Sequence, residues 1–366
     1  MRSDTRVRAI LVDLIHPRML PEHALDRLSE LEELTRTYGG IVVVKAYQRR
    51  FNPHPRTFLG PGKVTDLAEE GKALGAKLLV VNDRLKPQQA YNVEQMLKGT
   101  GIAVWDRLDL ILKIFARHAR TTEAKLEIEL ASVRHMGPRI FGMGMELSRQ
   151  GGGTGTRGVG ETNIERMKRH LREKERRIKE KLETHHGVRK THQQGRKRSG
   201  FKTVAVVGYT NAGKTTLLNA LTGRKEYAAD ELFATLDTRV GKLYLPRAGR
   251  EALVSDTIGF IKQLPPELLN AFASTLSEAV EADLLLHVVD GSDAHAPAHV
   301  KVVDEILIRL GAADIPRLMV INKADAMGSA APVPLSRALD GRRKVLVSAE
   351  TGGGIPELVA KIDGML

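Results

Sequence analysis

One stretch of the chain spaces glycine, lysine and threonine as a phosphate-binding loop requires. Gly208–Thr215 reads GYTNAGKT, which fits the pattern G-x-x-x-x-G-K-[ST]. Such a loop turns its backbone N–H groups inward, and the amino-terminus of the following helix adds partial positive charge. The Lys214 amine can then reach the β- and γ-phosphates, and the Thr215 hydroxyl suits Mg²⁺. The predicted contacts in this loop are Gly208, Tyr209, Thr210, Asn211, Ala212, Gly213, Lys214, Thr215 and Thr216.

The tetrapeptide NKAD at Asn322–Asp325 predicts which base the ligand carries. The Asp325 carboxylate can accept hydrogen bonds from N1–H and the N2 amino group of guanine, and adenine has no such pair of donors. Asn322 can hold the base and the neighbouring loop, and the stem of Lys323 can lie over the ring. Further contacts to the guanine, some through the backbone to O6, are expected from the motif SAETGGG, at Ser348, Ala349 and Glu350. These residues together predict a guanine nucleotide.

Two further motifs predict the segments that sense the γ-phosphate. In DTIGF, Asp256 can hold the water shell of Mg²⁺, and the Gly259 N–H can meet the γ-phosphate. In FATLDTR, Thr235 is expected to offer Mg²⁺ a second hydroxyl, with Thr238 as the alternative. Loss of the γ-phosphate would release both segments. The predicted metal ligands are Thr215, Thr235 and Asp256, the predicted catalytic residues are Lys214, Gly259 and Thr235, and the nucleotide contacts in DTIGF are Asp256, Thr257, Ile258 and Gly259.

Phe260 and Asn211 bear on how the reaction is catalysed. Many GTPases carry a glutamine after DxxG that orients the attacking water, and a phenyl ring at Phe260 cannot do so. Either intrinsic hydrolysis is slow and a partner completes the site, or other groups place the water. Asn211 can help to hold K⁺ beside the phosphates, where the cation would offset developing negative charge. The alternative for Asn211 is a bond to its own loop backbone.

The motifs need an α/β framework, and the apolar pattern supplies one. Runs typical of buried strands precede the phosphate loop (Val204–Val207), DTIGF (Ala252–Val254) and NKAD (Leu318–Ile321). Because α/β folds bind ligands at the carboxyl ends of parallel strands, the motifs should meet at one sheet edge. We therefore expect a P-loop GTPase domain over residues 199–366, with a mostly parallel sheet and helices on both faces.

Residues 1–105 alternate strand-like and helical stretches, which predicts a separate α/β subdomain. The expected strands are Ala9–Ile15, Ile41–Ala46, Leu78–Asn82 and Ile102–Trp105. The expected helices are Pro21–Thr37, Gly62–Leu74 and Lys86–Lys98. The GPGK segment at Gly60–Lys63 lacks the spacing and the Ser/Thr of a phosphate loop, so a helix start is favoured there over ATP binding.

Residues 106–198 are expected to form a long antiparallel helical hairpin that ends in a basic linker. Apolar residues recur mainly every three or four positions over Leu108–Val133, which predicts one helix, and again over Ile164–Leu182. The intervening segment Gly151–Glu161 is too rich in glycine to pack. It is either a flexible connector or a loop that becomes ordered on a partner.

The net charge of +13 is concentrated in residues 161–198, which hold 14 Lys/Arg against 6 Asp/Glu. Helical pairs such as Glu173 with Arg177 can balance part of this excess, but the run Arg189–Arg198 contains no acid. Basic clusters of this kind favour nucleic-acid contact, with a solvated linker as the alternative. The predicted RNA contacts are Arg157, Arg189, Lys190, Arg196, Lys197 and Arg198.

Composition argues against several other classes of protein. A chain of 366 residues with 42% hydrophobic residues supports two or three domains with real cores. The absence of cysteine rules out disulfides and thiolate zinc sites and is compatible with a cytoplasmic location. No apolar stretch is long enough to span a membrane, and Asp13 interrupts the short run that would serve as a signal peptide.

Several stretches of the chain resemble the HflX family of ribosome-associated GTPases, and the resemblance spans nearly the whole length. They are QRRFNPHPRTFLGPGKV (Gln48–Val64), DRLDLILKIFARHARTTEAKLEIELA (Asp106–Ala131), GTGTRGVGETNIE (Gly153–Glu165) and FATLD (Phe233–Asp237). The resemblance implies an amino-terminal α/β domain with a helical hairpin that contacts RNA of the large ribosomal subunit. It also implies a role in splitting or rescuing stalled ribosomes, and a hydrophobic residue after DxxG is usual in that family.

The chain departs from the family pattern in two places. FATLD continues directly as TRV, without the usual proline and further threonines, which shortens the predicted switch loop. The sequence stops at Leu366, where many relatives carry a further small domain. We expect a monomer that binds GTP or GDP and the large ribosomal subunit. The alternatives are a GTP-switched RNA-binding module with negligible hydrolysis and a GTPase acting on free RNA, as in ribosome assembly.

Overall fold

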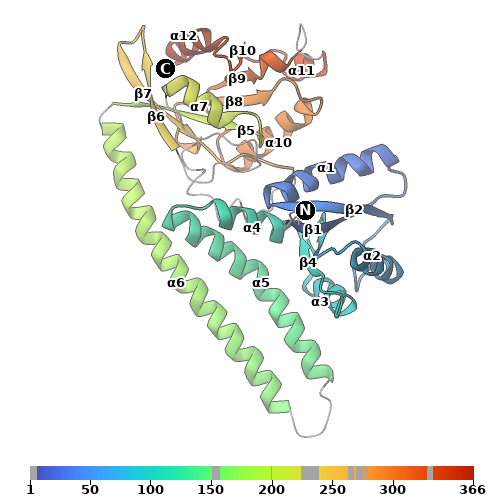
Figure 1. Ribbon diagram of the computed structural model, residues 1–366. Coiled ribbons are helices and arrows are strands. Elements are labelled where there is room, and N and C mark those ends of the chain that lie inside the picture. Colours follow the sequence, from blue (N-terminus) through green and yellow to red (C-terminus); the bar gives the residue numbers. More distant parts are fainter. Residues whose placement is uncertain are drawn as a thin grey trace. The chain divides into compact units, whose positions relative to one another are not determined.

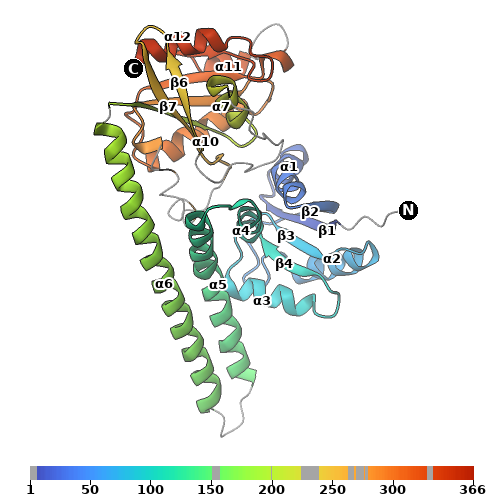
Figure 2. The ribbon, with the colours of Figure 1, turned by 60° about the vertical axis from the view of Figure 1, so that its left-hand side comes forward.

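Figures 1 and 2 show a computed structural model of the chain from two sides. It describes residues 6–150, 157–198, 200–223, 239–262, 268, 276, 279–327 and 333–366. The chain divides into two compact units, Met1–Arg117 with Leu126–Lys181 and His118–Lys125 with Leu182–Leu366. Each unit contains one β-sheet, which confirms the prediction of two α/β domains with a helical region between them in the sequence.

The first unit is built on a four-stranded parallel sheet with the order β2-β1-β3-β4. Its strands are β1 (Val7–Ile15), β2 (Gly40–Arg49), β3 (Leu78–Val81) and β4 (Ala103–Asp106). The helices between them are α1 (Pro21–Thr37), α2 (Pro61–Ala73) and α3 (Pro87–Met96). These elements match the predicted ones because buried parallel strands are continuous apolar runs and each helix starts with a proline, whose fixed φ suits a first turn.

Helices α2 and α3 pack on one face of this sheet. Val12 of β1, Val64 of α2 and Val93 of α3 belong to the same buried cluster. The GPGK segment forms the start of α2, with Gly60 as the N-cap and Pro61 as the first helical residue. The prediction of a helix start at this segment is therefore confirmed.

Two helices follow β4 where the apolar pattern suggests one. The expected single helix over Leu108–Val133 is wrong, because α4 (Arg107–His118) and α5 (Thr122–Gln150) are separate helices. Thr121 lies at the break, and its Oγ1 accepts the backbone N–H of Ala124 at 3.2 Å. A threonine cap of this kind starts a new helix, and the regular apolar spacing concealed it.

Helix α6 (Arg157–Arg198) extends beyond its predicted limits. It starts within the expected glycine-rich loop and continues as helix through the expected linker. α5 and α6 contact each other, with Arg134 Nε 2.9 Å from Glu175 Oε1 and a Cβ on Gly137 placed 3.8 Å from Leu171 Cδ1. The residue numbers of these contacts rise along α5 and fall along α6, so the two helices are antiparallel. No helix in the described part of the chain is long and apolar enough to cross a membrane.

A buried ionic cluster ties α5 to the sheet of the first unit. Arg139 of α5 lies 2.6 Å from the carboxylates of both Asp106, at the end of β4, and Asp109, in α4. His135, one turn earlier on α5, lies 3.1 Å from Asp109 and 3.3 Å from Asp106. Burial opposes protonation of His135, but its close pairing with the two aspartates outweighs burial and raises its pKa to about 9. Two positive charges therefore balance two negative ones.

The second unit is built on a six-stranded sheet with the order β10-β9-β8-β5-β7-β6. Its strands are β5 (Lys202–Gly208), β6 (Arg239–Leu245), β7 (Arg250–Asp256), β8 (Leu284–Asp290), β9 (Arg317–Asn322) and β10 (Lys344–Leu346). β6 runs antiparallel to β7, and the other neighbouring pairs of these strands are parallel. The sheet is therefore mostly parallel, as predicted.

Helices cover both faces of this second sheet (Figure 1). They include α7 (Lys214–Thr222), α10 (Ala296–Arg309), α11 (Val333–Ala338) and α12 (Ile355–Met365). Val288 and Val320 face the cluster that contains residues of α7 and α12, whereas the next residues, Val289 and Ile321, face α10 and α11. Successive side chains of a strand point to opposite faces, so continuous apolar strands serve two layers of helices.

Candidate nucleotide-binding site

The predicted nucleotide motifs meet along one edge of the six-stranded sheet. GYTNAGKT begins at the end of β5, DTIGF at the end of β7 and NKAD at the end of β9, and SAETGGG follows β10 after one residue. β7 is parallel to β5, β5 to β8, β8 to β9 and β9 to β10. The carboxyl ends of these strands therefore share one edge of the sheet. This is the edge at which α/β folds bind ligands.

The phosphate loop connects β5 to α7 and buries its lysine. Gly213 caps α7 with φ of 85°, and a Cβ there would lie 2.2 Å from Asn322 Nδ2, so glycine is required. The Nζ of Lys214 donates a hydrogen bond to the Tyr209 carbonyl at 2.8 Å. Burial lowers the pKa of Lys214 to about 8, against the opposing charge of Asp256. A desolvated ammonium of this kind gains strongly from an anionic ligand.

The two described residues predicted to hold Mg²⁺ lie side by side. Thr215 Oγ1 donates a hydrogen bond to Asp256 Oδ2 at 2.7 Å, although the residues belong to different motifs. Asp256 is fully buried at the end of β7, and Thr215 lies in the first turn of α7. A hydroxyl and a carboxylate are hard oxygen ligands that suit Mg²⁺. The pair therefore fits the ion in chemistry.

Asn322 connects the phosphate loop to the loop after β10. Its Nδ2 donates to the Ala212 carbonyl at 2.9 Å, and its Oδ1 accepts the Ala349 N–H at 3.0 Å. The side chain is only 2% exposed. The predicted hold on the neighbouring loop is thus present in the structure, and it extends to the phosphate loop as well.

Asp325 stands at the exposed side of the same edge. Its Oδ1 accepts a hydrogen bond from Ser348 Oγ at 2.5 Å, and this bond is the main reason that its pKa lies below the usual value. Lys323 has a left-handed backbone with φ of 62°, and its Nζ lies 2.8 Å from Asp290 Oδ2 at the end of β8. Glu350 is exposed in the adjoining loop. The carboxylate is therefore ionised and oriented, as an acceptor for base N–H groups must be.

The side chains that follow Asp256 in DTIGF serve the core rather than the site. Thr257 Oγ1 donates to the Val206 carbonyl at 2.7 Å, and Ile258 and Phe260 are buried. If Thr257 and Ile258 contact the nucleotide as predicted, they must do so through their backbone atoms. Phe260, fully buried, has no side-chain route to a water at the site.

Asn211 is exposed at the tip of the phosphate loop. It has a left-handed backbone with φ of 61°, a conformation that asparagine tolerates better than most residues. Thr210, beside it, is buried, and Thr216 is partly buried in α7.

Some predicted site residues lie outside the described part of the chain. Thr235 and Thr238 belong to residues 224–238, which the structure does not describe. Arg157 is the first residue of α6, and the remaining predicted RNA contacts lie in its last turns, where the backbone but not the side chains is described. They are Arg189, Lys190, Arg196, Lys197 and Arg198.

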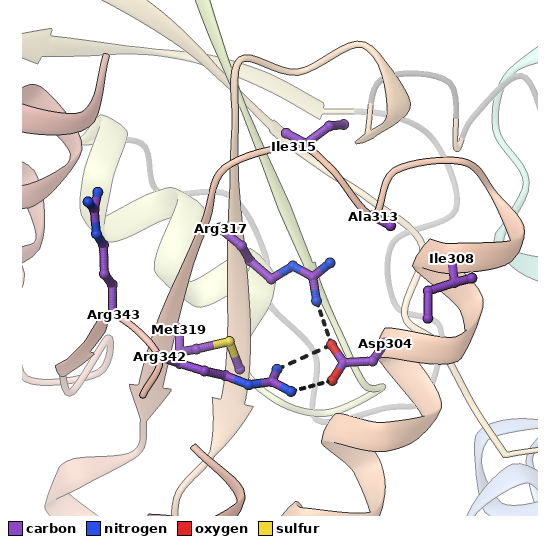
Figure 3. Close-up of a pocket in the computed structure, with 8 residues that line it drawn as sticks. All are labelled: Asp304, Ile308, Ala313, Ile315, Arg317, Met319, Arg342 and Arg343. Carbon is purple, nitrogen blue, oxygen red and sulfur yellow. Dashed lines mark hydrogen bonds and ion pairs between the residues drawn. The ribbon is translucent and has the colours of Figure 1, made fainter. Parts of the chain in front are cut away.

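A different hollow of about 410 Å³ lies at the opposite end of β9 (Figure 3). Arg317 begins that strand, whereas Asn322 ends it. Arg317 and Arg342 both point toward Asp304 of α10, at 2.5 and 2.8 Å, while Arg343 points away. The hollow is thus remote from the nucleotide motifs, and its carboxylate is already paired with two guanidinium groups.

The ionic cluster of the first unit has the composition of a metal site but not its chemistry. Asp106, Asp109 and His135 bring one potential ligand atom each to within 4.8 Å of one another. Arg139 already bridges both carboxylates, and both also lie within 3.3 Å of His135 Nε2. The cluster is therefore an ion-pair network.

Three family models match consecutive parts of the chain. They are described as GTP-binding GTPase N-terminal over residues 25–116, GTP-binding GTPase Middle Region over residues 118–196, and 50S ribosome-binding GTPase over residues 203–323. The last of these covers the phosphate loop, DTIGF and the first two residues of NKAD. Together they follow the same order along the chain as the sheet of the first unit, the long helices and the sheet of the second unit.

Individual relatives match nearly the whole chain. The GTPase HflX of Caldanaerobacter subterraneus subsp. tengcongensis is 43% identical over 356 residues, which cover 97% of this chain and 80% of the relative. The GTPase HflX of Escherichia coli is 39% identical, with 98% and 82% covered. Among solved structures, a complex of SsGBP with GDP is 25% identical with a TM-score of 0.53 and covers 98% of both chains. With matching motifs, matching fold and this identity over almost its full length, the chain belongs to the HflX family of GTPases.

Proposed function

We propose that the chain carries out the GTPase reaction of its family at the edge formed by β5, β7, β9 and β10, in association with the large ribosomal subunit. The observation that carries this proposal is the amide of Asn322, whose two bonds join the phosphate loop to the loop beside Asp325. This amide supports the proposal because it links the residues proposed to bind phosphate with those proposed to read the base. The GDP complex of SsGBP supports the same reading.

In this proposal, the loop N–H groups and Lys214 bind the β- and γ-phosphates. Thr215 and Asp256 would hold Mg²⁺, together with Thr235 or Thr238, and the ion would supply positive charge that offsets the charge of the phosphate oxygens. The Gly259 N–H meets the γ-phosphate, and Asp325, Ser348 and Ala349 recognise guanine. Hydrolysis breaks the bond from the γ-phosphorus to the bridging oxygen while water supplies the new P–O bond.

The partner in this proposal is RNA of the large subunit. The basic helix α6 and the family description of a 50S ribosome-binding GTPase support it. We propose three functional regions, residues 1–105, 106–198 and 199–366, with the first two as the ribosome-binding part. The process served is ribosome splitting or rescue, and a role in subunit assembly is the alternative.

Multiple-turnover phosphate release, with and without purified large subunits, tests the proposal. We expect slow release by the chain alone, because Phe260 is buried and cannot orient water, and faster release with subunits. Lys214→Ala should abolish release in both conditions. Co-sedimentation with subunits in a GTP analogue, in GDP and without nucleotide should show binding that depends on the nucleotide. The assembly alternative would be favoured if subunits changed neither the rate of phosphate release nor the sedimentation of the chain, while free RNA changed both.

We further propose that K⁺ assists hydrolysis through Asn211. The residue is exposed at the loop tip, and a cation held there by its amide oxygen would offset negative charge that develops on the phosphates. Turnover should be faster in K⁺ than in Na⁺ at equal ionic strength, and Asn211→Ser should remove the difference. Equal rates in both salts for the native chain would refute the proposal.

A further inference from the structure

Three hydrogen bonds fasten the segment after DTIG onto the phosphate loop. The Phe260 N–H donates to the Gly208 carbonyl at 3.1 Å, and the Thr210 N–H donates to the Phe260 carbonyl at 2.8 Å. The third bond uses a side chain, because the Lys262 N–H donates to Tyr209 Oη at 2.9 Å. Any sequence could form the first two, whereas the third depends on a tyrosine in the loop.

The Tyr209 ring is itself held from the side of α10. It lies flat on the imidazole of His299, with ring centroids 3.7 Å apart and planes 7° apart. His299 Nδ1 in turn lies 3.0 Å from Asp293 Oδ2, in the loop between β8 and α10. The hydrogen bond from His299 is the main cause that lowers the pKa of Asp293 to about 2, so this carboxylate is charged at neutral pH. The tyrosine hydroxyl therefore has a fixed position.

The fastened segment sets where Gly259 lies. A Cβ at Gly259 would be 2.7 Å from Thr210 Cγ2 and 3.0 Å from Lys214 Nζ, so the backbone here touches the phosphate loop. Gly259 is the proposed donor to the γ-phosphate, and the buried Phe260 side chain offers no alternative contact. Catalysis must then depend on the placement of this backbone.

We infer that Tyr209 is a positioning residue for GTP hydrolysis. Its hydroxyl fixes the backbone that follows Gly259 against the phosphate loop, and His299, held by Asp293, fixes the tyrosine ring. The inference rests on the proposed function of this site. It gives a task to a loop position that the phosphate-binding pattern leaves unrestricted.

Tyr209→Phe tests the hydroxyl while keeping the ring. We expect kcat at saturating GTP to fall roughly 3- to 10-fold, as expected for one neutral hydrogen bond. The affinity for GDP and the melting temperature should change little, because the bond lies on the γ-phosphate side. Tyr244→Phe is the matched control, since that tyrosine is 61% exposed on β6, and its kcat should equal that of the native chain.

His299 provides a second, independent pair of variants. His299→Ala removes the ring stacked on Tyr209 and should lower kcat, whereas His299→Phe restores an aromatic face and should recover most of it. Rescue of kcat by the aromatic variant, at constant GDP affinity, is not expected of a residue that only stabilises the fold. This pair also decides the question if Tyr209→Phe does not fold.

Native kcat in Tyr209→Phe, or equal kcat in both His299 variants, would overturn the inference. A loss of kcat that only follows an equal loss of GDP affinity and melting temperature would also overturn it, because Tyr209 would then be purely structural. Failure of the native chain to bind GDP or hydrolyse GTP is a different result and would refute the proposed function instead.

Discussion

Asn322 and Asp325 stand three residues apart in NKAD and have opposite surroundings. Asn322 is buried, and both ends of its amide are bonded to backbone groups of two loops. Asp325 is exposed and keeps one carboxylate oxygen bonded to Ser348. The motif thus divides into a residue that joins two loops and an exposed carboxylate, which we propose reads the base.

Asp325→Asn should lose the preference for guanine. An amide would turn an N–H donor toward the N–H donors of the base, so we expect GDP affinity to fall by roughly 2–4 kcal/mol, as for an unsatisfied polar contact. Calorimetric titration with GDP and with xanthosine diphosphate measures the change, because xanthine replaces the amino donor by an acceptor. The exposed Asp314→Asn is the control and should bind GDP normally. Equal GDP affinity in the two variants would contradict the assignment of Asp325.

Sequence reasoning located in the fold those segments whose signal is local. The phosphate loop, NKAD and the starts of α1, α2 and α3 are each defined by neighbours in the chain. The contacts of Tyr209 with His299 and Lys262 were not predicted, because they join residues from separate elements that carry no motif. Aromatic stacking and backbone hydrogen bonds of this type depend on how the elements pack, and composition or periodicity does not encode them.

At the scale of elements, the sequence predicts where helices lie but not where each one begins and ends. The pattern over Leu108–Val133 has one period and yet belongs to two helices, because the Thr121 cap acts within a single turn. α6 is a single helix of 42 residues although it contains Gly187 and Gly195. Glycine lowers helix propensity by only about 1 kcal/mol, and the surrounding Arg, Lys, Glu and Gln are good helix formers.

The basic end of α6 should bind the large subunit through phosphate groups. A variant with glutamine at Arg189, Lys190, Arg196, Lys197 and Arg198 should bind subunits more weakly, because each lost phosphate contact lowers the salt slope by about 0.7–0.9. Its GDP affinity should be unchanged. Co-sedimentation at several salt concentrations measures the slope.

The control for this variant lies on the same helix. Arg176, Arg177 and Lys179 are each paired with a glutamate one turn away, so their replacement by glutamine should alter the slope less. If the two variants have the same salt slope as the native chain, the end of α6 is a solvated helix without a role in binding.

At the scale of the whole molecule, each unit buries a histidine, and the two histidines differ in protonation state. His135 in the first unit is protonated between Asp106 and Asp109. His287, in β8 of the second unit, is neutral, because burial, helped by the charges of Arg317 and Arg342, lowers its pKa to about 3 against the charge of Asp304. The units should therefore respond to pH in opposite directions.

The direction of each pH effect on stability follows from comparing the pKa of the folded chain with the ordinary histidine pKa of 6.5. The stability that His135 contributes is full below pH 6.5 and is lost as the pH rises through 9, since the unfolded chain releases the proton first. His287 binds a proton more readily in the unfolded chain, so the second unit loses stability as the pH falls from 6.5 toward 3. Each effect should amount to about 1–3 kcal/mol.

Urea unfolding between pH 4 and pH 9 tests this prediction. Fluorescence of Trp105, the single tryptophan of the chain, reports the first unit, and binding of a fluorescent GDP reports the second. His135→Gln should flatten the alkaline loss alone, and His287→Gln the acid loss alone. Parallel pH profiles for the two probes would contradict the separate titration of the two units.

The bridge made by Asn322 also makes the two halves of a nucleotide thermodynamically linked. A fragment that orders one loop reduces the conformational freedom of the other, so each fragment raises the affinity for its counterpart. Guanosine should therefore bind about fivefold or more tightly when pyrophosphate saturates the phosphate loop. Asn322→Ala should bring this factor to one, and titration of guanosine with and without pyrophosphate would measure it. A single buried amide would then make one receptor out of two weak fragment sites.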